Sequence, residues 1–253
     1  MDPQDTSDAS SSRRRVPTAP IRACPLPIRR YHDLVIDAET LRKVELLGSL
    51  PADQLDAVAA QARPVKLTRG DLLFNHNDEP DALFVVLNGR VAILNTAADG
   101  RESMVALMEA GDLFGELPLF DGRPRSAAAR ALEPSEVVHI PYAALREIYD
   151  AHPELLWQVV GLLAQRLRAT DEALADSVFL DVTGRTAKRL LELSSGDDEF
   201  VLPITQEELA GMIGASRERV NKAISSFVRL GWIEQSDRRY RITDRDQMER
   251  RSR

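Results

Sequence analysis

Cysteine is nearly absent from this 253-residue chain, which contains Cys24 alone. A single cysteine cannot form an intramolecular disulfide, and it cannot by itself hold a zinc ion or an iron–sulfur cluster, which take several thiolates. We therefore expect a protein of the reducing cytoplasm with no metal centre. Aromatic residues are also scarce, at 5%, beside 29% charged and 43% apolar residues, a composition typical of soluble globular proteins.

Long hydrophobic runs are missing as well. The apolar stretches, such as residues 157–164, are interrupted within about eight residues, whereas a helix that spans a bilayer needs about 20. No hydrophobic segment of the secretory type follows the N-terminus. A catalytic nucleophile paired with a base is also not evident, since His139 and His152 have no clear partners in the sequence. These patterns predict neither a membrane protein nor an enzyme.

The net charge of −7 is distributed unevenly along the chain. From Gly184 onward the sequence holds 14 Lys and Arg against 12 Asp and Glu, a net of +2, which leaves −9 for residues 1–183. The basic C-terminal part is therefore the candidate for binding a polyanion such as DNA.

The N-terminal part divides into a tail and a domain at residues 38–152. Residues 1–30 are rich in Ser, Pro, Asp and Arg and predict a disordered tail. Helical spacing of apolar residues over 38–62 predicts two short helices. From 65 to 141 short apolar runs are separated by dipeptides such as Asn88-Gly89 and Asp99-Gly100, which favour two-residue hairpin turns. This texture predicts an antiparallel β-barrel or roll.

A long helix is predicted after a short one at 142–150, and it defines a segment at 153–181. Its apolar positions follow alternating spacings of four and three, which indicates the seam of a parallel dimer. A stripe that only covers the barrel is the alternative. Residues 181–184 break the pattern and predict a hinge. The seam residues are Leu156, Val160, Leu163, Leu167, Thr170, Leu174 and Ser177.

The C-terminal segment at 184–248 has the signals of a winged helix-turn-helix. Thr205 and Glu208 form a capping box, Gly214 permits a tight turn, and Ser216 begins a second helix. The exposed side of that helix can enter the major groove of DNA, where Arg grips guanine and Glu accepts from cytosine. The DNA-contacting residues that we predict are Thr205, Gln206, Ser216, Arg217, Glu218, Arg219, Asn221 and Lys222.

Three motifs together resemble one family. ITQEELAGMIGASRERVNKAI, preceded by FLDVTGRTAKRLLEL and GELPLFDGRPRSA, is similar to the CRP/FNR family of bacterial transcription factors, and most to its cyclic-AMP receptor branch. The resemblance covers about residues 40–245. It implies an α+β fold with a cyclic-nucleotide-binding β-roll (a double-stranded β-helix or jelly roll), a dimerisation helix and a winged helix-turn-helix. It also implies a homodimer that binds double-stranded DNA and contacts RNA polymerase.

The resemblance assigns roles to a short loop. Gly115-Glu116-Leu117 and Arg125-Ser126 match the family's phosphate-binding cassette. Arg125 and Ser126 would bind the phosphate of cyclic AMP, Glu116 would accept from the ribose hydroxyl, and Gly115 would allow close backbone approach. A plain surface ion pair between Glu116 and Arg125 is the alternative.

The long helix of relatives carries a Thr-Ser pair that contacts adenine. Thr170 matches that pair and Asp171 departs from it. A carboxylate accepts a hydrogen from adenine N6 but repels guanine O6, so we expect a preference for cyclic AMP over cyclic GMP. In the second helix of the helix-turn-helix, Arg217, Glu218 and Lys222 match positions that specify bases in relatives, so the resemblance implies half-sites like TGTGA in an inverted repeat. Arg219 stands where many relatives have threonine, and we expect it to strengthen a phosphate contact.

Other ligands remain open at this point. A regulator of the same fold could be constitutive or could sense cyclic di-GMP. It could also be a gas sensor that binds haem, with His76 as the axial ligand. An FNR-like iron–sulfur sensor is nearly excluded by the lone Cys24.

Overall fold

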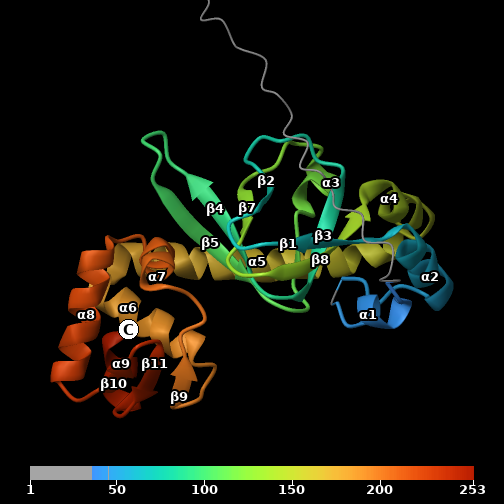
Figure 1. The fold of residues 1–253 in the computed structure, drawn as a ribbon. Coiled ribbons are helices and arrows are strands. Elements are labelled where there is room, and N and C mark those ends of the chain that lie inside the picture. Colours follow the sequence, from blue (N-terminus) through green and yellow to red (C-terminus); the bar gives the residue numbers. More distant parts are fainter. Residues whose placement is uncertain (1–35, 45) are drawn as a thin grey trace, which may run out of the picture.

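The computed structural model describes residues 36–44 and 46–253. The predicted tail, with Cys24, lies outside these residues. Figure 1 shows a β-roll beside the long helix α5, with α1, α2 and α4 near one end of that helix and the C-terminal domain near the other. The first part of the chain forms α1 (Ala38–Arg42), α2 (Ala52–Gln61), β1 (Arg63–Leu67), β2 (Leu72–Phe74), β3 (Ala82–Asn88), β4 (Val91–Thr96), β5 (Glu102–Met108), β6 (Leu113–Phe114), α3 (Leu117–Asp121), β7 (Ala128–Ala131), β8 (Ser135–Pro141) and α4 (Tyr142–Ala151).

The remainder forms α helices around one small sheet. A 3₁₀ turn, Pro153–Leu155, leads into α5, and Asp181 then separates α5 from the C-terminal domain. The elements are α5 (Leu156–Phe179), α6 (Val182–Leu193), β9 (Glu199–Val201), α7 (Gln206–Ile213), α8 (Arg217–Arg229), β10 (Ile233–Ser236), β11 (Arg239–Ile242) and α9 (Arg245–Arg251).

The roll consists of two antiparallel sheets within the described residues, with strand orders β1-β8-β3-β6 and β2-β7-β4-β5. Strand β3 is buried on both faces because side chains alternate across a strand. Phe84 and Val86 belong to the cluster inside the roll, whereas Leu83 and Val85 pack with the N-terminal helices and α4. Strand β3 therefore contributes to two apolar clusters, one inside the roll and one between the roll and its helices.

The turns of the roll differ in part from the prediction. Asp99-Gly100 joins the paired strands β4 and β5, as a hairpin turn does. Asn88-Gly89 instead connects strands of different sheets, so it is a corner and not a hairpin. Gly89 has φ +82°, and a Cβ there would lie 2.3 Å from the Ser135 Oγ. The glycine is needed for this close approach as well as for its backbone angle.

The C-terminal domain has the helix-turn-helix signals that the sequence predicts. Thr205 Oγ1 accepts from the Glu208 amide at 3.2 Å and Glu208 Oε2 accepts from the Thr205 amide at 2.6 Å, which completes the capping box. Gly214 ends α7 with φ +69°, and Ser216 caps α8. Helix α6 begins at Val182 and not at Gly184 as predicted, because the Asp181 side chain accepts from the Gly184 amide at 2.8 Å and caps it.

The exposed apolar face of α5 shares Val160, Leu167 and Leu174 with the predicted seam and lies one residue further along the chain at the alternate positions. Leu163 packs partly against the core of the roll, and Val159 is fully buried there. Leu162, next to Leu163, also packs partly against this core. The side chains that remain exposed define a stripe, which we call the α5 stripe: Trp157, Val160, Ala164, Leu167, Asp171, Leu174 and Val178.

Candidate functional site

A cluster around the end of β6 brings together most of the predicted ligand residues. Gly115 follows β6 with φ +77°, and a Cβ there would lie 2.7 Å from Arg125 Nη1. Only glycine tolerates both the backbone angle and this neighbour. Glu116 is 1% exposed and Arg125 is 3% exposed. Two charged side chains thus lie inside the protein at the two ends of one loop.

Arg125 is held by neutral groups. Its Nη2 donates to the Ala82 carbonyl at 2.7 Å, and its Nη1 donates to the Gly115 carbonyl at 2.9 Å and to the Tyr142 hydroxyl at 3.0 Å. The guanidinium also lies over the Phe74 ring, 4.2 Å from the ring centroid. Its Nε is buried without a hydrogen-bond partner. Burial lowers the pKa of Arg125, an effect that Tyr142 partly opposes.

Tyr142 fixes the same loop from the start of α4. Its hydroxyl donates to the Gly115 carbonyl while it accepts from Arg125. Burial raises the pKa of Tyr142 to about 12, so the hydroxyl keeps its proton at neutral pH and remains a donor. The sequence analysis did not find Tyr142, because it lies 27 residues from Gly115 and no local pattern links the two positions.

Glu116 is paired with a residue that the sequence analysis also missed. Its Oε1 accepts from Arg166 Nη1 at 2.5 Å, and Arg166 Nη2 donates to the Leu113 carbonyl. The simple ion pair between Glu116 and Arg125, considered as an alternative, is not the arrangement found. A polar residue on the roll-facing side of an apolar helix was the available signal for Arg166.

The remaining predicted ligand residues lie at the edge of this cluster. Ser126 and Leu117 are exposed beside their buried neighbours Arg125 and Glu116. On α5, the Thr170 hydroxyl donates to the Arg166 carbonyl at 2.9 Å, and Asp171 is exposed next to it. Arg166 therefore links the loop to the helical turn that carries Thr170 and Asp171.

The predicted DNA-contacting residues fall into two groups, the exposed charged residues of α8 and the residues that are helix caps or are partly covered. Arg217, Glu218, Arg219 and Lys222 are exposed on the first turns of α8. The opposite side of the helix packs into the domain core through Val220, Ala223, Ile224 and Phe227.

Thr205, Gln206, Ser216 and Asn221 are engaged or partly covered. Thr205 and Ser216 are helix caps, and Gln206 Nε2 donates to the Tyr240 hydroxyl at 3.4 Å. Asn221 is half-buried, and its Oδ1 has no hydrogen-bond partner. The exposed charged residues among the predicted DNA contacts are therefore the four on α8.

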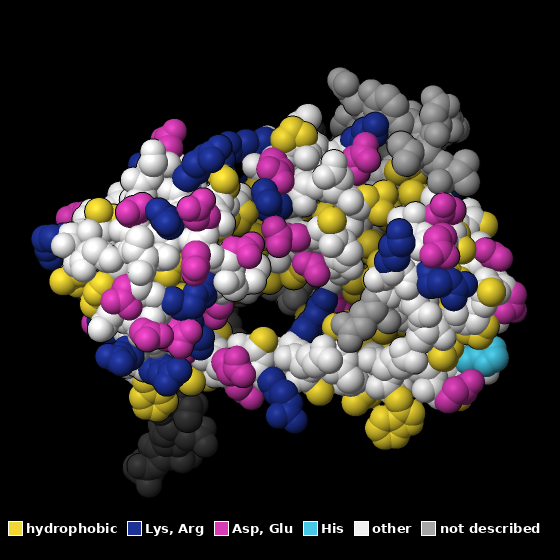
Figure 2. Space-filling model, turned by 90° about the horizontal axis from the view of Figure 1, so that it is seen from below, with side chains coloured by type: hydrophobic (Ala, Val, Ile, Leu, Met, Phe, Trp, Pro, Cys, Tyr) yellow, Lys and Arg dark blue, Asp and Glu magenta, His cyan; other side chains and the backbone are white. Residues whose placement is uncertain are grey.

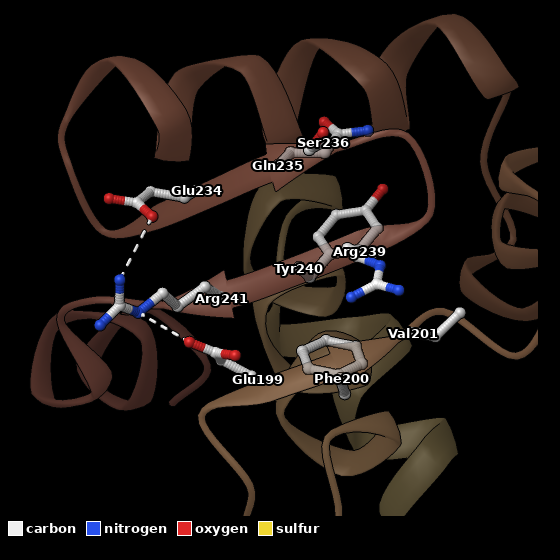
Figure 3. Close-up of a pocket in the computed structure, with 9 residues that line it drawn as sticks. All are labelled: Glu199, Phe200, Val201, Glu234, Gln235, Ser236, Arg239, Tyr240 and Arg241. Carbon is white, nitrogen blue, oxygen red and sulfur yellow. Dashed lines mark ion pairs between the residues drawn. The ribbon is translucent and has the colours of Figure 1, made fainter.

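Two hollows accompany these sites. A groove of about 630 Å³ lies on the small sheet of the C-terminal domain, where Arg241 pairs with Glu199 at 3.3 Å and with Glu234 at 3.7 Å (Figure 3). A larger hollow of about 1230 Å³ lies between the β4–β5 hairpin and the α7–α8 turn. Both are open to the surface and mix acidic with basic side chains, and Figure 2 shows the same mixture over the C-terminal domain, on the left.

Comparison with known proteins decides the family. Residues 64–152 match the cyclic nucleotide-binding domain, and residues 184–251 match the Crp-like helix-turn-helix domain. A CRP-like cAMP-activated global transcriptional regulator of Mycobacterium tuberculosis is 36% identical over 222 residues, which cover 85% of this chain and 99% of that protein. The chain belongs to the CRP/FNR family. It is a transcription regulator with a cyclic-nucleotide-binding domain and a helix-turn-helix.

Other relatives of this CRP/FNR regulator agree in sequence or in fold. The cAMP-activated global transcriptional regulator Vfr of Pseudomonas aeruginosa is 35% identical over 71% of this chain and 88% of its own. The solved structure of FixK2 from Bradyrhizobium japonicum has a TM-score of 0.70 at 19% identity and covers 76% of this chain and 98% of its own. That likeness shows the shared fold.

Metal-binding groups and membrane-spanning helices are two features of other protein classes. Among residues 36–44 and 46–253, no three His, Cys, Asp or Glu side chains form a group suited to a metal ion. Within the same residues, no helix has both the length and the apolar character needed to cross a bilayer.

Proposed function

We propose that the regulator is a cytoplasmic homodimer whose binding to DNA is controlled by cyclic AMP. The observation that carries this proposal is the environment of Arg125. Its charge is buried, its hydrogen-bond partners are carbonyls and a hydroxyl, and its Nε is without a partner. The neighbouring acid, Glu116, is already paired with Arg166. A bound anion is the partner that a buried guanidinium in such surroundings needs.

The chemistry of a cyclic nucleotide fits the cluster around this arginine. The phosphate would lie against Arg125 and the exposed Ser126. The ribose hydroxyl would donate to Glu116, whose Oε1 accepts from Arg166 and whose Oε2 can accept as well. The adenine amino group would reach the Thr170–Asp171 turn of α5. The cAMP-activated relatives support this choice of nucleotide.

The regulated step would be a shift between conformations of the dimer. Ligand must bind the two conformations unequally to change DNA affinity. The favoured conformation would set the two α8 helices about 34 Å apart, one turn of DNA. Arg217, Glu218 and Lys222 would then read TGTGA-like half-sites of an inverted repeat. The regulator bound there would contact RNA polymerase.

Calorimetric titration of the purified protein with cyclic AMP, cyclic GMP and cyclic di-GMP tests the ligand. We expect saturable binding that is tightest for cyclic AMP. Arg125→Gln should weaken it at least about 30-fold, because loss of one partner of a buried charge pair costs about 2–5 kcal/mol. Arg123→Gln is the matched control, since Arg123 is exposed in the same loop, and it should bind like the wild type.

The same proteins then test the control of DNA binding. Cyclic AMP should tighten wild-type binding to a TGTGA inverted repeat more than to a scrambled duplex, and it should fail to do so for Arg125→Gln. Absence of cyclic-AMP binding, or equal binding by Arg125→Gln, would contradict the proposed ligand. Binding without a change in DNA affinity would make the regulator constitutive.

A further inference from the structure

The α5 stripe is an apolar surface without a partner in the single chain. Trp157 is 77% exposed, Val160 52%, Leu167 62%, Leu174 63% and Val178 67%. Side chains this large are rarely left in water on one continuous face. In Figure 2 hydrophobic side chains project from the lower rim of the molecule. The other side of α5 is already covered, because Val159 and Leu163 pack against the roll.

The spacing of the α5 stripe indicates that a second copy of this chain covers the stripe. Its members are three and four residues apart throughout, from Trp157 to Val178. This is the a/d pattern of a coiled coil, with Val160, Leu167 and Leu174 at d and Asp171 at a. A helix with this repeat fits best against its own copy. A twofold dimer is also what a regulator that reads an inverted repeat requires.

In a parallel seam of this kind each a residue faces the same residue of the other copy. Asp171 therefore faces Asp171 of the second copy. It is the one charged member of the stripe, and it lies between the apolar residues Leu167 and Leu174. The charged neighbours on the same helix are Arg168, one turn earlier, and Glu172. Arg166 is committed to Glu116.

We propose that these two facing carboxylates oppose dimer contact in the ligand-free protein and that a nucleobase amino group relieves them. The inference rests on the proposed function and deepens it. Two like charges at a seam that excludes water repel more strongly than in bulk solvent. An exocyclic amino group that donates to Asp171 offsets part of this repulsion. Ligand binding and dimer contact then strengthen each other, since coupling between two binding steps is reciprocal.

Sedimentation equilibrium of the full chain without ligand tests the repulsion. The neutral isostere Asp171→Asn should lower the dimer dissociation constant about three- to tenfold at low salt, as expected for removal of a poorly screened like-charge contact. Added NaCl should tighten the wild-type dimer and leave Asp171→Asn nearly unchanged. Glu172→Gln is the matched control, because this exposed neighbour lies off the stripe, and it should behave as the wild type.

Saturating cyclic AMP tests the coupling in the same experiment. It should tighten the wild-type dimer by a larger factor than the Asp171→Asn dimer. A weaker dimer of Asp171→Asn would mean that Asp171 pairs with a cation such as Arg168 of the second copy, and would overturn the inference, as would an unchanged dimer. A wild-type chain that stays monomeric would instead contradict the proposed homodimer, so the two failures are distinguishable.

Discussion

At the scale of single residues, the ligand loop depends on groups that lie far from it in sequence. The Gly115 carbonyl accepts from both Tyr142 and Arg125, and among the described residues Arg125 donates to no carboxylate. The loop conformation is thus set before any ligand arrives. Such preorganisation lowers the entropy cost of ordering the site when ligand binds.

Replacement of Tyr142 by phenylalanine should loosen this loop. The change removes a donor to the Gly115 carbonyl and an acceptor from Arg125, and a buried polar group left without its partner costs about 1–3 kcal/mol. We expect the dissociation constant of cyclic AMP, measured by calorimetry, to rise about tenfold. Tyr149→Phe is the control, because the Tyr149 hydroxyl is buried without a hydrogen-bond partner, and it should leave the affinity unchanged. Equal losses in the two variants would refute a specific role of Tyr142.

The motif residues of the loop could be predicted, but their partners could not. Glu116 and Arg125 stand in a short pattern that a reader of the sequence can match. Arg166 is 50 residues from Glu116, and only the packing of α5 on the roll brings them together. Local propensity carries no information about such a contact.

At the scale of elements, the joint between α5 and α6 is fastened by side chains of the C-terminal domain. Arg251 of α9 contacts the Asp181 carboxylate, which also caps α6. Arg185 donates to the Leu180 carbonyl at 2.6 Å and to the Ile213 carbonyl at 3.0 Å. Side chains of α6 and α9 therefore contact the segment that the sequence predicts as a hinge. The angle between α5 and α6 sets the position of α7 and α8 relative to α5.

Arg251→Gln should weaken this joint. Asp181 is well exposed and Arg251 partly exposed, so solvent screening limits the loss in the free energy of unfolding to about 0.5–1 kcal/mol. Urea denaturation followed by circular dichroism measures it. Arg253→Gln, which removes only an exposed pair with Glu249 at 3.6 Å, is the control and should have no measurable effect. An equal free energy of unfolding for Arg251→Gln and Arg253→Gln would show that the contact between Arg251 and Asp181 does not stabilise the joint.

The positions of helices and their caps could be predicted from the sequence more completely than the faces that the helices expose. The caps of α7 and α8 depend on residues within one turn, which the sequence contains in full. The face that α5 exposes depends on how the helix packs on the roll, which partly covers both Leu162 and Leu163, and the sequence does not contain that tertiary contact in any local pattern. The corner at Gly89 was likewise mistaken for a hairpin, since the same dipeptide serves both.

At the scale of the whole molecule, the C-terminal domain rests on the β4–β5 hairpin. The Ser103 hydroxyl donates to the Gly211 carbonyl at 3.2 Å, and Met212 packs against the cluster of Ala92, Leu94 and Met104. The exposed Arg69 and the partly buried Glu208 add an ion pair at 3.8 Å. These contacts give the roll and the domain that contains α8 a second connection, through β5 and α7, beside the one through α5.

Met212→Gln should separate these two parts without unfolding either. A polar amide placed against an apolar cluster loses the packing of the methionine and costs hydrogen bonds to water. We expect amide hydrogen exchange over residues 102–108 and 206–213 to become severalfold faster, with little change in β1 and β3. Val228→Gln is the control, because Val228 is exposed in the same domain. Unchanged exchange in β5 would show that the contact contributes nothing to its protection.

The exposure of Trp157 has a practical consequence. The chain has two tryptophans, and the other, Trp232, stacks on Phe227 with ring centroids 5.8 Å apart inside the C-terminal domain. Indole emission shifts to shorter wavelength when water is removed, so Trp157 would respond to association of two copies. Trp232 would respond to changes around α8. Single-tryptophan variants would therefore give separate optical signals for assembly and for the DNA-reading domain, without an attached dye.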